Sequence, residues 1–209
     1  MRSPRLILAL VSLSGLLAAC NGGSASPPTL GSGNTFAFRF TESVGQFYRD
    51  YTGPQRPALN AIAADGSFVS ASQTIVLTAK MAGPVFAGGP NYFVWGIDRG
   101  GATSAPFPDE PNVKFNAVVV VTADPANGTA LTAVVNLLNG AQPQTVAAGL
   151  LAPDTIQVVV PASALPATGT VAASQYQWNL WPRNGLGGTA AAQIASFIPD
   201  NALATLLQQ

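Results

Sequence analysis

Apolar and polar residues alternate with a period of two along much of the chain, and residues typical of turns separate the alternating stretches. This pattern is typical of β-strands that have one face on a core. The stretches that predict strands are 36–41, 75–81, 92–97, 113–122, 129–138, 145–150, 155–160, 175–181 and 193–198. Residues 113–122 are so rich in valine that both faces of the strand should be largely covered, which predicts a central strand.

Turn chemistry supports this assignment. Residues 124–128 combine proline with Asn-Gly, a sequence that favours a tight reversal between 113–122 and 129–138. Asp65-Gly66 also predicts a turn, ahead of the strand at 75–81. Pro161 should end the strand at 155–160 because proline cannot donate into a β-ladder.

No long segment shows a helical period. Pro199-Asp200 predicts the start of a short C-terminal helix, in which Leu203, Leu206 and Leu207 would share one side. The pattern therefore predicts an all-β fold, an antiparallel β-sandwich of eight or nine strands with a short C-terminal helix, and a closed β-barrel is the alternative. Residues 42–64 have no clear period, and we expect a long loop that packs Phe47, Tyr48 and Tyr51 on the sandwich.

The N-terminus has a different composition. Arg2 and Arg5 precede an apolar run at 6–17, and small residues then lead to Cys20. This order is typical of a signal peptide, and the run is shorter than the roughly 20 apolar residues that span a bilayer. We expect a signal peptide at 1–19, a flexible Gly/Ser/Pro-rich tether at 20–33 and a single domain at 34–209.

Leu17-Ala18-Ala19-Cys20 resembles the lipobox of bacterial lipoproteins at all four positions. The resemblance implies cleavage before Cys20, a diacylglyceryl group and often a further acyl chain such as palmitate on this residue, and a lipid anchor on the extracytoplasmic side of a bacterial membrane in the cell envelope. Either membrane, inner or outer, fits. The alternative is an ordinary secretion signal, which would leave Cys20 as a free thiol. Cys20 is the only cysteine, so the chain forms no internal disulfide.

Charge is sparse and balanced, with nine basic and nine acidic side chains. Loss of residues 1–19 would remove Arg2 and Arg5 and leave a net charge of −2. Nucleic-acid binding needs a basic stripe, and none is evident, so no nucleic-acid partner is expected.

Candidate chemistry is limited because the chain contains no histidine. The usual general base near neutral pH and the commonest zinc and haem ligand are therefore missing. A serine–lysine pair would need Lys80 or Lys114, and both occupy polar positions of predicted strands. We expect a protein that is not an enzyme and has no cofactor.

One acidic group remains, in the loop that follows the strand at 92–97. Asp98, Asp109 and Glu110 flank this loop. Their carboxylates are candidates for a calcium site, or for the acid and base of a glycosidase. The alternative is a solvated hairpin loop in which Asp98 simply pairs with its neighbour Arg99.

A ligand surface is predicted near the end of the strand at 175–181. The alternation turns Tyr176, Trp178 and Leu180 inward and leaves Trp181 on the polar side, next to Arg183. An exposed tryptophan suggests stacking against a ligand. Trp181, Arg183, Asp98 and Arg99 are the candidate binding residues, with burial of Trp181 beneath a neighbouring loop as the alternative.

The strand that ends in Ile97-Asp98, the Gly/Thr/Pro-containing loop after it, and the later strands at 156–160 and 176–181 resemble extracytoplasmic β-sandwich modules of the DOMON and carbohydrate-binding family 9 type. Members of that group bind sugars or haem. Haem ligation in the group uses Met and His, and the chain has no His, so haem is not expected.

Three functions follow, in order of preference. The first is a lipid-anchored envelope protein whose non-catalytic module binds a glycan or another neutral ligand. The second is a structural or assembly lipoprotein that contacts another envelope protein, and the third is a carboxylate-dependent glycosidase. A sugar site should show rings beside polar groups in a concave surface, whereas a protein contact needs a broad apolar patch.

Overall fold

A computed structural model describes residues 38–101, 104–107, 110–187 and 190–209. The predicted signal peptide, Cys20, the tether and Asp109 lie outside the described residues. None of the helices in the described part of the chain is long and apolar enough to cross a membrane.

Strands make up almost all of the regular structure. The strands are β1 (Phe40–Thr41), β2 (Ala61–Val69), β3 (Thr74–Met81), β4 (Asn91–Asp98), β5 (Ala105–Phe107), β6 (Glu110–Phe115), β7 (Ala117–Ala123), β8 (Leu131–Asn136), β9 (Gln144–Ala152), β10 (Thr155–Pro161), β11 (Gln177–Arg183), β12 (Ala204–Thr205) and β13 (Leu207–Gln208). The helical elements are the short 3-10 turns η1 (Pro57–Leu59), η2 (Pro125–Asn127), η3 (Ala162–Ala164) and η4 (Ala173–Gln175), and one turn of α-helix, α1 (Ala190–Gln193). The predicted all-β fold is confirmed.

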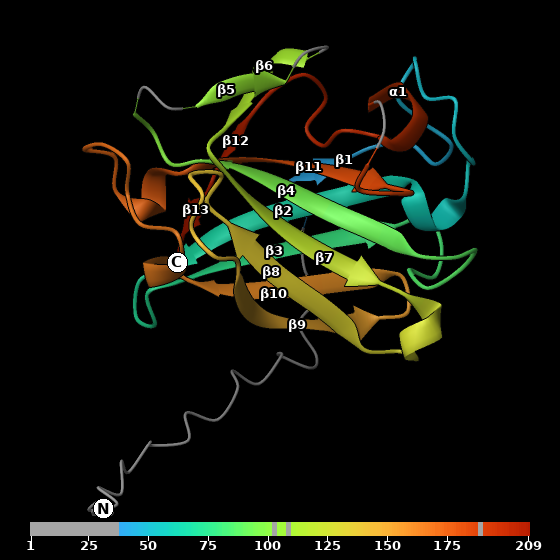
Figure 1. The fold of residues 1–209 in the computed structure, drawn as a ribbon, viewed down its shortest axis with the longest axis horizontal. Helices are drawn as coiled ribbons and strands as arrows, with labels where there is room; N and C mark the ends of the chain where they lie inside the picture. The colour runs from blue at the N-terminus through green and yellow to red at the C-terminus, as the bar shows by residue number, and fades with distance from the viewer. Residues whose placement is uncertain (1–37, 102–103, 108–109, 188–189) are drawn as a thin grey trace, which may run out of the picture.

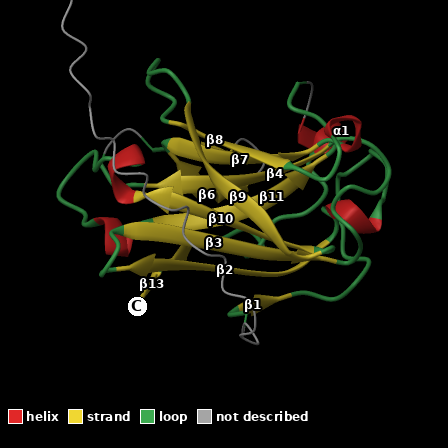
Figure 2. Cartoon of the chain, turned by 90° about the horizontal axis from the view of Figure 1, so that it is seen from below, coloured by secondary structure: helices red, strands yellow, loops and turns green. Residues whose placement is uncertain are grey.

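The strands form an 11-stranded sheet in the order β1-β2-β3-β10-β9-β8-β7-β4-β11-β12, with β13 beside β2, and a separate β5–β6 hairpin. All pairs are antiparallel except β13 with β2. The sheet curls at β9, which pairs with β10 in one half and with β8 in the other. The two halves therefore face each other as two layers of one curled sheet (Figures 1 and 2).

The main hydrophobic core fills the space between these layers. In β7 the alternation is regular, with Val119 and Val121 fully buried and Val118 and Val120 half-buried. The β7–β8 hairpin predicted from the turn at 124–128 is confirmed. Completely buried large side chains of this core include Phe93, Trp95, Ile97, Ile75, Leu77, Ile156, Tyr176, Trp178 and Leu180.

A second, smaller core lies on the outer face of β4 and β11. It contains Val94, Val113, Trp181, Ile194 and Phe197. The β5–β6 hairpin and the segment 194–198 cover this face, so β11 is buried on both sides. This layer was not expected from the sequence, and it positions the site described below.

Two predictions about local structure are wrong. Residues 113–122 do not form one strand, because Asn116 separates β6 from β7. Asp65-Gly66 lies inside β2 rather than in a turn. A Cβ on Gly66 would lie 2.5 Å from the Trp178 indole nitrogen, so this glycine allows the ring to pack directly on the strand.

The C-terminal prediction also needs correction. Residues 200–209 form no helix but the short strands β12 and β13, and 193–198 is not a full strand but makes isolated bridges to β11 at Leu180 and Arg183. The leucines that suggested a helix alternate instead, with Leu206 buried and Leu207 exposed.

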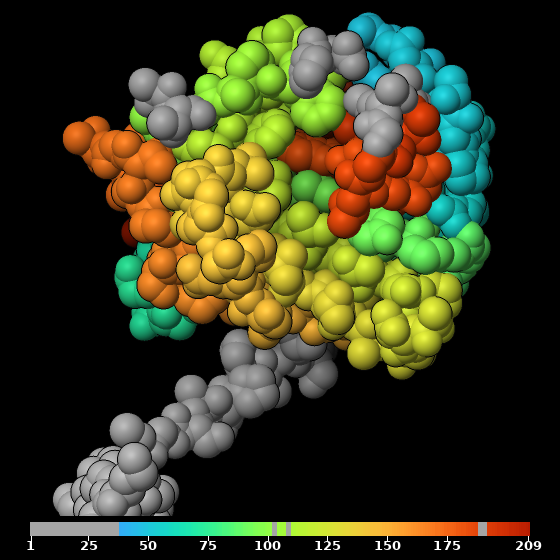
Figure 3. All heavy atoms as spheres, in the orientation of Figure 1, coloured from blue at the N-terminus to red at the C-terminus, as the bar shows by residue number. Residues whose placement is uncertain are grey.

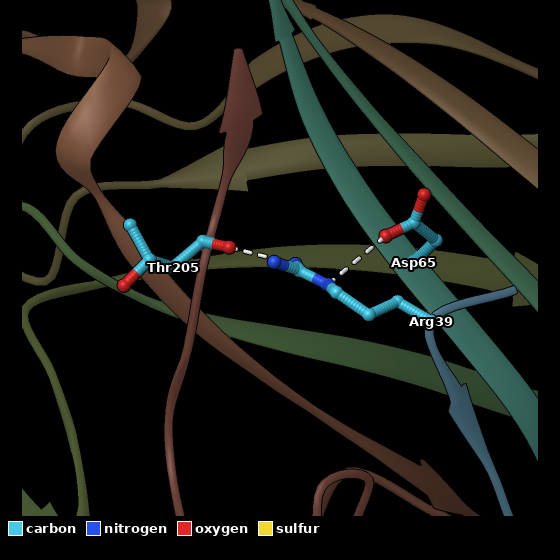
Figure 4. Close-up of polar contacts among 3 residues, drawn as sticks. All are labelled: Arg39, Asp65 and Thr205. Atoms are coloured by element: carbon cyan, nitrogen blue, oxygen red, sulfur yellow. Dashed lines mark hydrogen bonds and ion pairs between the residues drawn. The ribbon is translucent and has the colours of Figure 1, made fainter.

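The C-terminal strands connect the two open edges of the curled sheet, because β12 pairs with β11 and β13 pairs with β2. Arg39 supports this connection. Its guanidinium donates to the Thr205 carbonyl at 2.6 Å and lies 3.5 Å from the Asp65 carboxylate (Figure 4). The fold therefore comes close to the closed barrel that was the predicted alternative. In the described chain, however, only the short strands β12 and β13 join the two edges of the sheet, and no continuous β-ladder does.

Candidate functional site

A cleft of about 510 Å³ opens where three segments distant in sequence meet. These segments are the irregular chain after β1, the start of β6, and the chain between α1 and β12. Figure 3 shows the chain after β1, in cyan, beside the red-orange chain around α1 at one end of the molecule. The cleft is lined by Glu42, Gln46, Phe47, Tyr48, Arg49, Glu110, Pro111, Ser196, Phe197, Asp200 and Asn201.

Asn60 and backbone hydrogen bonds hold the 42–49 segment in place. The Asn60 side chain accepts from the Gly45 amide and donates to the Gln46 carbonyl, both at 2.7 Å. Gly45 has φ +86°, a conformation that other residues adopt at a cost. The Tyr48 amide donates to the Ala195 carbonyl at 2.7 Å. The irregular segment is therefore fixed to both the sheet and the 194–198 segment.

Aromatic rings form one wall of the cleft. Tyr48 meets Phe197 edge to face, with ring centroids 5.2 Å apart. Phe197 is buried, and its ring contacts Phe107 with centroids 5.4 Å apart. Phe107 in turn contacts Trp181 at a centroid distance of 5.6 Å. Phe47 and Tyr48 are only half-buried. The wall is thus anchored in the second core and keeps part of its ring surface accessible.

Three acidic residues line the cleft. Burial, and then the nearby charge of Asp200, raise the pKa of the Glu42 carboxyl from 4.5 to about 7. Glu110 is only 4% exposed, whereas Asp200 is exposed. Within the described residues, the ion pairs are Arg39–Asp65, Arg49–Asp50 and Lys80–Asp154. None of them involves the three cleft acids.

Among the described residues that line the cleft, Arg49 is the one with a cationic side chain. Its Nε lies 3.2 Å from the Asp50 carboxylate, and this hydrogen bond is the main reason why the pKa of Arg49 is raised. A smaller contribution to the raised pKa comes from Glu110. Arg49 is highly exposed, so its charge is well screened by water.

Ser196 contributes a polar atom with no partner. The residue is 3% exposed, and its Oγ makes no hydrogen bond within the described part of the chain. Buried hydroxyls normally have a partner, because leaving one unsatisfied costs about 1–3 kcal/mol. Ser196 belongs to the residues that line the cleft, so a ligand bound there is a candidate partner for this group.

The prediction that Trp181 is exposed is wrong. Trp181 is 2% exposed and packs against Phe107, Phe115 and Phe197. Strand alternation does turn it away from the main core, but the β5–β6 hairpin covers that side. The burial removes the reason for placing Trp181 on a ligand surface.

Arg183 is half-buried and donates from Nη2 to the Gln193 side chain at 2.8 Å. Burial lowers its pKa. Arg183 therefore connects the end of β11 to α1. The Asn184 amide supports this connection, because it donates to the Gln193 carbonyl at 3.1 Å. Neither Arg183 nor Trp181 lines the cleft described above.

Arg99 and Asp98 organise the loop after β4. Arg99 is 2% exposed and donates to the Asn116 side chain at 2.8 Å, the Asn116 carbonyl at 3.1 Å and the Pro166 carbonyl at 2.7 Å. Desolvation lowers its pKa. Asp98 accepts from the Gly100 amide at 2.8 Å and the Ser104 hydroxyl at 2.6 Å. Asp98 and Arg99 form no ion pair with each other.

The structure separates two members of the predicted calcium set. Asp98 lines a second, more open hollow with Lys114 and Asn201, whereas Glu110 lines the cleft. Asn201 borders both hollows, so they are neighbours. The described residues contain no cluster of three or more acidic or cysteine side chains suited to a metal ion, and Asp109 lies outside them.

Sequence reasoning identified Glu110 but missed Glu42, Ser196 and Asp200. The segment that carries Glu42 has no period and was expected only to pack its aromatic residues. A signal was present, since Phe47 and Tyr48 stand close to Glu42 and Arg49. Rings and charged groups in one irregular segment are typical of a binding loop held by a rigid scaffold.

Comparisons with known proteins add little. No protein-family model matches the chain, and a search of curated proteins finds no similar sequence. The structural search finds a crystal structure of a proposed carbohydrate-binding protein from Bacteroides uniformis, with 13% identity and a TM-score of 0.25. The match covers 60% of this chain and 63% of that chain, less than two thirds of its length. A similarity at this level carries no argument about fold or ligand.

Proposed function

We propose that the protein is a non-catalytic binding module that takes a glycan into the cleft between Glu42, Glu110 and Asp200. The observation that carries the proposal is the composition of the cleft, in which partly accessible rings stand beside carboxylates and amides. Sugar sites have this composition because ring faces pack on C–H groups while polar side chains accept and donate hydrogen bonds to hydroxyls.

The cleft favours a small polar ligand over a protein partner. Among the described residues, the large apolar side chains that are clearly exposed are Val44, Leu138, Leu186 and Leu207, which come from four different segments. Single exposed apolar residues are ordinary on protein surfaces. A structural or assembly role therefore remains the second choice.

We also propose that Cys20 carries the lipid anchor, as the resemblance to the lipobox implies. The proposal places the module in the cell envelope, on the extracytoplasmic side of a bacterial membrane. Residues 21–33 would then separate the binding cleft from the bilayer by at most ~3.3–3.6 Å per residue if extended. A reach of this size suits a module that samples ligands near the membrane.

The test is binding of a panel of neutral, acidic and basic oligosaccharides to the purified full-length protein, followed by calorimetry on the best ligand. Tyr48→Ala should weaken binding about 2- to 13-fold, because a ring contact contributes ~0.5–1.5 kcal/mol. Tyr92→Ala is the matched control, since Tyr92 is also half-buried but does not line the cleft. Absence of binding to every sugar, or equal effects of the two variants, would contradict the proposal.

A carboxyl with a pKa near 7 is also typical of a general acid. The same panel should therefore be assayed for hydrolysis. Turnover that disappears in Glu42→Gln would replace the binding function with a carboxylate-dependent glycosidase.

A further inference from the structure

We infer that the ligand of the cleft carries an ammonium group, as an unacetylated amino sugar does, and that Glu42, Glu110 and Asp200 bind this group. This inference rests on the proposed glycan-binding function and specifies the class of sugar. The charge of the cleft, the unpartnered hydroxyl of Ser196 and the aromatic residues that line the cleft support it.

The charge of the cleft is unbalanced. Among the described residues, three acidic side chains and one arginine line it, and the arginine is already bonded to Asp50 at 3.2 Å. No cationic side chain of the described chain lies within ion-pair distance of the three acids. Bringing carboxylates together in a partly buried space without a counter-charge is costly. A cationic ligand would remove this cost, whereas an acidic sugar would increase it.

The raised pKa of Glu42 also favours a cationic ligand. With the cleft empty, the raised pKa of about 7 means that Glu42 holds a proton on a substantial fraction of molecules at neutral pH. Burial and the Asp200 charge cause the rise. An ammonium group supplies the positive charge that this proton otherwise provides.

Ser196 is an independent observation that points to a ligand. Its hydroxyl is buried, has no partner among the described residues, and belongs to a residue that lines the cleft. A hydroxyl can accept from an ammonium N–H or donate to a sugar oxygen. The backbone on either side is occupied, because the Ala195 carbonyl accepts from Tyr48 and the Ile198 amide donates to Leu180.

The ligand has the character of an organic cation rather than a metal ion. The described residues offer no cluster of three or more side chains that could hold a metal ion. Tyr48 and Phe47 line the same cleft. The Arg49 guanidinium lies 6.0 Å from the Tyr48 ring centroid, so this ring already faces a cation, and Phe47 stacks on Tyr51. Aromatic faces attract ammonium groups, and an ammonium with three N–H donors can bond to separated oxygens.

The decisive experiment compares two ligands that differ only in charge. Calorimetry on the full-length protein would use an oligosaccharide of glucosamine and its fully N-acetylated counterpart of the same length. The amino form should bind at least about 10-fold more tightly, because a hydrogen bond to a charged group contributes ~1.5–3 kcal/mol. Asp200→Asn should reduce this preference to about 3-fold or less. Asp200 is exposed, so the variant is expected to fold, and circular dichroism checks this.

Asp154→Asn is the matched control, because Asp154 is a partly exposed carboxylate that lies 3.9 Å from Lys80 and does not line the cleft. It should leave the preference unchanged. If the N-acetylated sugar binds as tightly as the amino form, the inference is wrong while the glycan-binding function stands. If neither binds but another oligosaccharide of the panel does, only the inference is wrong, and if no sugar of the panel binds, both are wrong. An equal loss in Asp154→Asn and Asp200→Asn would show general charge attraction and would also overturn the inference.

Discussion

Replacing Glu42 with glutamine should stabilise the protein at pH 8 and leave its stability nearly unchanged at pH 4. The folded pKa of Glu42 is about 7, against 4.5 for the free side chain. Between these values the folded state binds more protons than the unfolded state, so the stability contributed by Glu42 is lost as the pH rises through this range. Glutamine has the same shape and does not titrate.

The magnitude follows from the two pKa values. A difference between 4.5 and about 7 corresponds to an upper limit of ~3.4 kcal/mol, at about 1.36 kcal/mol per pH unit. Glu42 is only half-buried, and solvent screening reduces the effect, so we expect a gain of about 1–2 kcal/mol. For a protein of this size, that gain corresponds to a rise in Tm of roughly 2–8 °C.

Urea unfolding of wild type and Glu42→Gln at pH 4, 6 and 8 measures the effect directly. The gain should appear between pH 5 and pH 8 and level off above that range. Asp50→Asn provides a control, because Asp50 is a well-exposed carboxylate whose ion pair is with its neighbour Arg49. A gain in Glu42→Gln that is equal at pH 4 and pH 8, or a loss at pH 8, would refute the reasoning.

Asn116→Ala should destabilise the protein by about 2–4 kcal/mol in urea unfolding, because it removes the side-chain partner of a buried guanidinium; a cost below ~1 kcal/mol would show that the backbone carbonyls suffice. Gly96→Ala should cost about 1–3 kcal/mol, because the added methyl group would overlap the Trp181 ring. Gly187→Ala, which has open space around it, should lie within ~0.5 kcal/mol of wild type, and equal effects of the two substitutions would contradict this packing argument. Cys20→Ala should move the protein from the membrane to the soluble fraction and abolish acyl labelling, because the substitution removes the residue that would carry the acyl chains of the anchor. Unchanged fractionation would contradict lipidation.

Local pattern was sufficient where a strand has one face on the core. The alternation in β3, and the proline and Asn-Gly turn before β8, led to the right elements. Here the residues themselves encode which side is buried, because side chains of a strand point alternately to opposite faces. The absence of long helices followed from the same reading.

Pattern failed where a second layer covers a face. Trp181 alternates away from the main core just as predicted, yet it is buried, because Phe107 and Phe197 arrive from other parts of the chain. Gly66 looked like a turn residue, and only the position of Trp178 shows why a strand needs a glycine there. A period along one strand contains no information about which distant segment will cover it.

The candidate site depends entirely on such distant contacts. The sequence by itself determined the all-β class, most of the strands and the lack of histidine chemistry, because these depend on local periodicity and composition. Only the tertiary structure brought Glu42, Glu110 and Asp200 to one cleft, since they belong to segments more than 60 residues apart in the chain. The raised pKa of Glu42 is likewise a tertiary property, because burial and a neighbouring charge exist only once these segments have met.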